Sequence, residues 1–205
     1  MKKRVLIIGE GFEEKPYLDK LLSFPIFGAD CHYSFAPVIN VKGNGNIFAR
    51  YQFEMQRGFN DAVLIFCDAD KGSEQFLQIR DKIGEMYFEN KEDAMLVFMF
   101  VNPVTLQVVL SHFGDVKITK VSKKKNAEIV EQLTGIKDYD AKDDQIAEMI
   151  GKIFYRSYEE MKKRVSNIST SFNDLPSTNF LLFLERFEGD DDSWIDQINN
   201  AMKKE

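Results

Sequence analysis

The stretch Val5-Leu6-Ile7-Ile8-Gly9-Glu10-Gly11 decides the fold class of this 205-residue chain. Its four consecutive apolar residues end at a glycine and an acid, and this pattern predicts a buried strand over residues 4–8. A second run, Leu64-Ile65-Phe66-Cys67, ends at Asp68-Ala69-Asp70 and predicts another buried strand over residues 62–67. Strands that are apolar throughout are typical of parallel sheets with helices on both faces. The sequence therefore predicts an α/β protein.

Helices and strands alternate through the first hundred residues. Besides the two strands above, the hydrophobic pattern predicts strands over residues 33–41 and 95–101 and helices over residues 13–22, 47–57 and 73–88. The segment Gly43-Asn44-Gly45-Asn46 indicates a turn before the second helix. We expect a three-layer sandwich around a mainly parallel sheet of about four strands.

The pattern changes after Pro103. We expect helices over residues 104–113, 126–133, 143–164, 178–187 and 193–203, a short edge strand over residues 116–121 and a polar connection over residues 166–177. The chain is thus divided into an α/β domain, residues 1–120, and a helical extension, residues 121–205. We expect the extension to pack on the domain because its aromatic residues, Phe154, Phe180, Phe183 and Trp194, need a surface to bury.

The composition excludes several classes of protein. The longest apolar run, residues 94–101, is much shorter than the ~20 residues of a membrane helix, and the first run is too short for an export signal. Cys31 and Cys67 lie far apart in sequence and suggest neither a disulfide framework nor a zinc cluster, so we expect a cytoplasmic protein. The net charge of −6, shared equally between residues 1–100 and 101–205, argues against nucleic-acid binding over the whole surface but allows a local basic groove.

Acidic residues follow both decisive apolar runs. Because parallel strands share one carboxyl edge, where ligands bind, we expect Glu10, Asp68 and Asp70 to meet there. Carboxylate oxygens as ligands suit Mg²⁺ or Mn²⁺. Each acid alone is equally well explained as a helix cap or a turn former. Together they would repel one another, which raises a pKa or demands a cation.

The order of these motifs resembles the Toprim domain, which occurs in topoisomerases, bacterial primases and OLD-family nucleases. That domain has a glutamate after its first strand and an Asp-x-Asp pair after a later one. The segment Glu10-Gly11-Phe12-Glu13-Glu14-Lys15-Pro16-Tyr17 is most similar to the stand-alone RloB-like branch, as are the turn Gly43-Asn44-Gly45 and the pair Asn102-Pro103 followed by His112. The resemblance covers residues 4–113 and departs at Leu106, where the branch usually has a glutamate.

The resemblance implies a Mg²⁺- or Mn²⁺-dependent protein that acts on nucleic-acid phosphodiesters. Glu10 would be the general acid or base, and Asp68 and Asp70 would hold the metal, with Glu14 as a supporting ligand. The candidate substrate-binding residues are Gly11, Asn44, Gly45, Gly72, Asn102 and His112. The branch implies a nuclease of prokaryotic defence against phage, which acts on DNA or RNA and has a possible defence partner protein.

Plainer roles and other functions stay open. Glu14 is also explained as an acid of the first helical turn, where the helix dipole favours negative charge. His112 is also explained as a capping or core residue, and Asn44 as part of a plain turn. Leu106 leaves a possible acid position unfilled, and with the acidic charge it favours the alternative of a non-catalytic Toprim-like module that binds a partner protein or nucleic acid. A receiver-like phosphotransfer domain ranks last, because its acid pair should follow the first strand.

Overall fold

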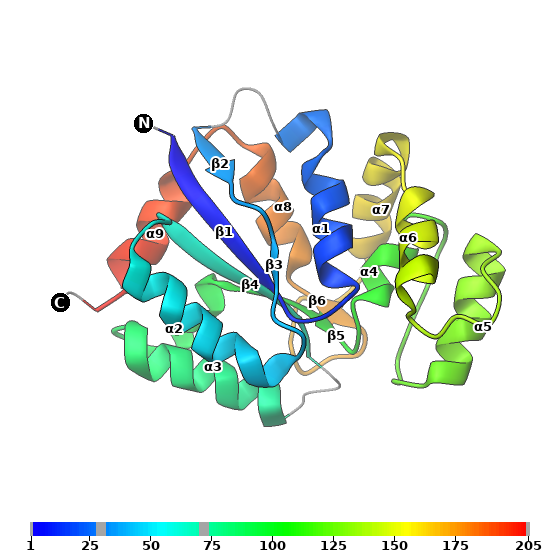
Figure 1. Cartoon of the computed structure of the whole chain (residues 1–205), viewed down its shortest axis with the longest axis horizontal. Coiled ribbons are helices and arrows are strands. Elements are labelled where there is room, and N and C mark those ends of the chain that lie inside the picture. Colours follow the sequence, from blue (N-terminus) through cyan, green and yellow to red (C-terminus); the bar gives the residue numbers. More distant parts are fainter. Residues whose placement is uncertain (1, 28–31, 70–73, 204–205) are drawn as a thin grey trace.

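A mixed, mainly parallel sheet forms the centre of the molecule (Figure 1). The structure is a computed structural model that describes residues 2–27, 32–69 and 74–203. Within these ranges the strands have the order β2-β1-β4-β5-β6, and β3 also pairs with β1. The strands are β1 (Lys3–Gly9), β2 (Tyr33–Phe35), β3 (Ile39–Asn40), β4 (Ala62–Asp68), β5 (Phe98–Asn102) and β6 (Ser177–Thr178). All pairings are parallel except β5 with β6. The predicted α/β class is confirmed.

The two apolar runs of the sequence form the neighbouring central strands β1 and β4. Their register runs from Val5 opposite Ala62 to Gly9 opposite Phe66. Nearly every residue of both strands is buried, because helices cover both faces of the sheet. This pairing brings the ends of β1 and β4 to the same edge.

Helices lie on both sides of the sheet. They are α1 (Glu14–Leu22), α2 (Ile47–Arg57), α3 (Glu74–Tyr87), α4 (Leu106–Leu110), α5 (Lys123–Thr134), α6 (Asp143–Gly151), α7 (Tyr158–Val165), α8 (Phe180–Glu188) and α9 (Ser193–Ala201). Helices α2 and α3 lie together on one side, and α1 and α8 on the other (Figure 1). The ring of Phe180 stacks on that of Phe66, with 5.1 Å between centroids, and so fixes α8 against β4.

The segment from 121 onward belongs to the same core as the sheet. Its buried apolar residues join those of the first strands in one cluster. It also supplies β6, which the sequence did not predict, and the register of β6 places Ser177 opposite Asn102. No helix in residues 2–27, 32–69 and 74–203 is long and apolar enough to cross a membrane.

The edge strand predicted over residues 116–121 is wrong. These residues are all described, and they run as an irregular segment. The buried side chain of Gln107 takes the place of a strand partner: its Nε2 donates to the Val116 carbonyl at 2.9 Å, and its Oε1 accepts from the Ile118 N–H at 2.7 Å. Both main-chain groups are therefore satisfied without a β-ladder.

Two predicted elements are interrupted in the structure. The predicted strand over residues 33–41 divides into β2 and β3 on either side of Pro37, which has no N–H for a sheet hydrogen bond. The predicted helix over residues 143–164 divides into α6 and α7. Helix α6 ends at Gly151, a weak helix former, and the hydroxyl of Ser157 donates to the Phe154 carbonyl in the connecting turn.

Candidate functional site at the carboxyl edge of the sheet

Glu10 and Asp68 lie next to each other at the carboxyl edge. The Glu10 N–H donates to the Phe66 carbonyl at 3.0 Å, which continues the pairing of β1 with β4. The Asp68 N–H donates to Glu10 Oε2 at 2.9 Å, so the glutamate side chain spans the two strand ends. The sequence-based expectation for these two acids agrees with their positions.

Glu14 turns back into the loop between β1 and α1. Its Oε2 accepts from the Gly11 N–H at 2.9 Å, and the side chain is buried although it lies in the first helical turn. A Cβ atom at position 11 would lie 2.9 Å from the same oxygen, so this approach favours glycine. Glu14 is thus part of the edge and does not point to solvent as a surface acid would.

Thr105 joins the third strand end to the acids. It follows β5, and both its N–H and its hydroxyl donate to Asp68 Oδ1, at 2.5 and 2.7 Å. Thr105 is completely buried. The sequence analysis missed Thr105, which lies inside the helix predicted over residues 104–113, because its contact with Asp68 joins residues 37 positions apart in the chain.

The acids at this edge act on one another electrostatically. Burial raises the pKa of Asp68 well above its ordinary range, the charges of Glu14 and Glu10 raise it further, and the hydrogen bond from Thr105 opposes the shift. Glu14 is buried and Glu10 and Asp68 are half-buried, and acids crowded together in this way retain a proton or attract a cation. Its donor atoms are carboxylate oxygens, which fit a hard cation such as Mg²⁺.

Glu13 and Tyr139 form a hydrogen-bonded pair beside the acids Glu10, Glu14 and Asp68. The Tyr139 hydroxyl donates to Glu13 Oε1. Burial raises the pKa of Glu13 to about 7, the Tyr139 hydrogen bond opposes this, and the charge of Glu14 adds to it. Tyr139 lies between α5 and α6, so the C-terminal part of the chain reaches the edge. The sequence analysis missed this pair because the two residues lie 126 positions apart.

The glycine turn lies at the same edge. The Gly43 N–H donates to the Glu10 carbonyl at 2.7 Å, and Gly43 has φ of 123°, which favours glycine. The turn η2 (Asn44–Asn46) begins directly after it. Asn44 is buried, and its Oδ1 has no hydrogen-bond partner within the described ranges. The structure thus brings Asn44 and Gly45 close to the Glu10 turn.

Asn102 and His112 make contacts within the protein. Asn102, at the end of β5, donates from Nδ2 to the carbonyls of Phe172 and Asp174, at 3.0 and 3.2 Å. The His112 ring is buried, with Nε2 3.2 Å from the Tyr17 hydroxyl and Nδ1 2.9 Å from the Ser157 hydroxyl. These contacts favour anchoring roles, and the substrate-binding roles of both residues stay predictions.

Part of the predicted site lies outside the described residues. Asp70 and Gly72 belong to this part, so the second acid of the Asp-x-Asp pair has no described position. Within residues 2–27, 32–69 and 74–203, no three His, Cys, Asp or Glu side chains are arranged to hold a metal ion. The metal site expected at Asp68, Asp70 and Glu14 therefore stays a prediction.

Comparison of the chain with protein-family models, curated proteins and solved structures found no match. The likeness to the Toprim domain therefore depends on the motifs and on the fold class alone.

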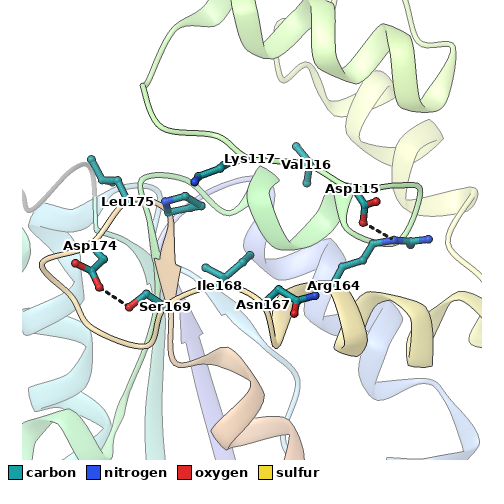
Figure 2. Close-up of a pocket in the computed structure, with 10 residues that line it drawn as sticks. Asp115, Val116, Lys117, Arg164, Asn167, Ile168, Ser169, Asp174 and Leu175 are labelled. Carbon is teal, nitrogen blue, oxygen red and sulfur yellow. Dashed lines mark hydrogen bonds and ion pairs between the residues drawn. The ribbon is translucent and has the colours of Figure 1, made fainter.

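A cavity of about 350 Å³ lies near the end of β5, between the segment after α4 and the loop before β6 (Figure 2). Arg164 lines it and pairs with Asp115 at 3.4 Å, and Nη1 of the same arginine donates to the Ser111 carbonyl. Across the cavity, the Ser169 hydroxyl donates to Asp174 Oδ2 (Figure 2). Charges of both signs pair within this cavity, so it does not form a uniform site for phosphate.

Proposed function

We propose that this protein is a Toprim-like phosphodiesterase that requires Mg²⁺ or Mn²⁺ and cleaves DNA or RNA. The observation that carries the proposal is the convergence of Glu10, Glu14 and Asp68 at the carboxyl edge, where burial and the charges of the two glutamates raise the pKa of Asp68. The order of the sequence motifs adds support. A role as a cytoplasmic defence nuclease with a partner protein follows from the RloB-like resemblance.

Each acid has a distinct role in this proposal. Asp68 and Asp70 would hold the cation, with Glu14 in support, and Thr105 fixes the Asp68 carboxylate by two hydrogen bonds. The cation, when bound, neutralises the charge that develops on the phosphate. Glu10, oriented by the Asp68 N–H, transfers the proton to or from the reacting oxygen.

The test is calorimetric titration with Mg²⁺ and Mn²⁺ beside a cleavage assay on single- and double-stranded DNA and RNA. Asp68→Asn and Asp70→Asn should weaken metal binding and abolish cleavage. Glu10→Gln should keep metal binding and lose ~10²- to 10⁴-fold in rate, the usual contribution of a proton-transfer group. Asp19→Asn, an exposed acid of α1, is the matched control and should change neither quantity.

A second candidate function is a non-catalytic module that binds a partner protein or nucleic acid. It is favoured by Leu106, which is buried where the Toprim branch usually has an acid, and by the lack of a three-acid cluster in the part of the chain that the structure describes. The same titration separates the two. A wild-type protein that binds no divalent metal at millimolar concentration would exclude the nuclease and leave the binding module.

A further inference from the structure

A smaller cavity, of about 160 Å³, lies beside the acidic edge. Val104 and Leu106 form part of its lining, and Glu13, Asn126 and Tyr139 supply polar groups. At ~30 Å³ per water molecule, it exceeds the space of a single water or ion, and it is smaller than the ~300–1,000 Å³ of sites for whole drug-sized ligands. It therefore suits one ring system of a larger molecule.

Asn126 is the polar residue of this cavity that most clearly points to a ligand. Its side chain is nine-tenths buried at the start of α5, and its Oδ1 has no hydrogen-bond partner in residues 2–27, 32–69 and 74–203. Buried acceptors are almost always paired, because an unpaired one loses its water without a replacement. A donor group on a ligand in the cavity would supply the missing hydrogen bond.

The position of the cavity connects it to the candidate site. Val104 and Leu106 lie on either side of Thr105, the residue that holds the Asp68 carboxylate. Glu13 lies between the site residues Glu10 and Glu14 in sequence and also lines the cavity. A group bound here is therefore adjacent to any phosphate held at the acidic edge.

We propose that this cavity binds one nucleobase of the nucleic-acid substrate, next to the phosphate that is cleaved. This assignment rests on the proposed function. The ring packs against Val104 and Leu106, and an exocyclic amino group donates to Asn126 Oδ1 and to the Glu13 carboxyl group. A phosphate is disfavoured because Asn126 Oδ1 and the Glu13 carboxyl group are acceptors and the Tyr139 hydroxyl already donates to Glu13. Lys123, at the same cavity, pairs with Asp140 at 3.2 Å.

The arrangement predicts which bases bind. Adenine, cytosine and guanine carry an exocyclic amino group, whereas uracil and thymine do not. A site that accepts a hydrogen bond from this group discriminates by ~5- to 100-fold. We expect oligo(A) and oligo(C) to bind at least about 5-fold more tightly than oligo(U).

The experiment measures the fluorescence anisotropy of labelled oligo(A), oligo(C) and oligo(U) with the full chain in EDTA, so that no cleavage interferes. Asn126→Leu keeps the size of the side chain and removes the acceptor, and it should reduce the preference for oligo(A) and oligo(C) to within about 2-fold of oligo(U). Asn60→Leu is the matched control, because its Oδ1 is also buried without a partner in the described part but lies before β4, at the opposite edge. It should leave the preference unchanged.

A second variant guards against a folding defect in the first. Ala141→Trp places a large ring at the lining of the cavity and should remove the same preference. A wild-type protein that binds all oligonucleotides equally, or variants that keep the preference, would overturn the base assignment and leave the nuclease proposal standing. Binding of AMP but of no oligonucleotide would assign the cavity to free nucleotides and overturn the proposal for a strand. If wild type binds no nucleic acid at all, both proposals fail.

Discussion

Glu13 couples the stability of the protein to pH near neutrality. Burial raises its pKa from 4.5 to about 7, so between these values the folded protein binds a proton that the unfolded chain has released. The contribution of this group to stability therefore decreases as the pH rises through this window and is lowest above pH 7.

Glu13→Gln should remove this dependence, because glutamine keeps an acceptor for the Tyr139 hydroxyl and has no charge to bury. We expect the free energy of unfolding to increase by about 1–3 kcal/mol at pH 8 and to change little at pH 4. Urea denaturation at both pH values, without divalent metal, measures this. Glu128→Gln, an exposed substitution on α5, is the control, and an equal effect of Glu13→Gln at both pH values would contradict the prediction.

His112 makes the stability of the protein depend on pH in the opposite direction, and it does so below neutral pH. Burial lowers its pKa from 6.5 to about 3, and the charge of Arg164 lowers it further, while the contact with Ser157 raises it. Below pH 6.5 the unfolded chain binds a proton that the folded protein excludes, so stability falls as the pH decreases toward 3.

His112→Gln should make the loss of stability between pH 6 and pH 4 shallower, by up to about 1.4 kcal/mol per pH unit. Glutamine can still form hydrogen bonds with Tyr17 and Ser157 but does not titrate. Thermal unfolding over this pH range checks the slope. The interpretation fails if the variant and the wild type lose stability in parallel.

At the level of elements, the segment after α4 depends on one side chain. Gln107 satisfies the main chain at Val116 and Ile118, as described above. Gln107→Leu should decrease the free energy of unfolding by about 1–3 kcal/mol, because it leaves these polar groups without their partner. Hydrogen exchange should speed up at the Ile118 amide. Ser111→Ala, in the same helical region, removes only a hydrogen bond to the Gln107 carbonyl and should leave that amide protected.

Elements with a strong local pattern were predictable from the sequence. The long apolar runs gave β1 and β4, and α2 was predicted with its observed bounds, Ile47–Arg57. The two residues of β6 are too few to form a pattern, and they become a strand only through pairing with β5. Residues 116–121 are the opposite case. Their local sequence favours a strand, but the side chain of Gln107, and not a neighbouring strand, makes the hydrogen bonds with their main chain.

The candidate site was predictable to the extent that topology determines it. Parallel strands share a carboxyl edge, so the meeting of Glu10 and Asp68 followed from recognising two buried strands. The contacts of Thr105, Tyr139 and Asn126 were not predictable, because each depends on how a distant segment packs against that edge. No motif in the sequence carries this information.

At the level of the whole molecule, the first 120 residues depend on those that follow. The Tyr33 hydroxyl donates to the Phe187 carbonyl at 2.6 Å, and Phe180 packs against both Phe66 and Tyr17. Helix α8 lies beside α1 on the same side of the sheet and covers the part of that face that α1 leaves open.

A fragment of residues 1–120 should not fold, since removing β6, α8 and α9 exposes a large apolar face of the sheet. We expect it to show no cooperative thermal transition by circular dichroism, whereas the full chain shows one. A fragment of residues 1–203 is the control. A cooperative transition of the short fragment would establish it as an independent domain.

The antiparallel pairing of β6 with β5 has a consequence for the folding of this protein during its synthesis on the ribosome. Strand β5 is complete at Asn102, but its outer neighbour is not made until Thr178. At ~5–20 residues per second, translation of the intervening segment takes roughly 4–15 s. During that interval the nascent chain carries an open apolar sheet edge, which is the kind of surface that chaperones bind. The native sheet closes only after Thr178 has emerged from the exit tunnel.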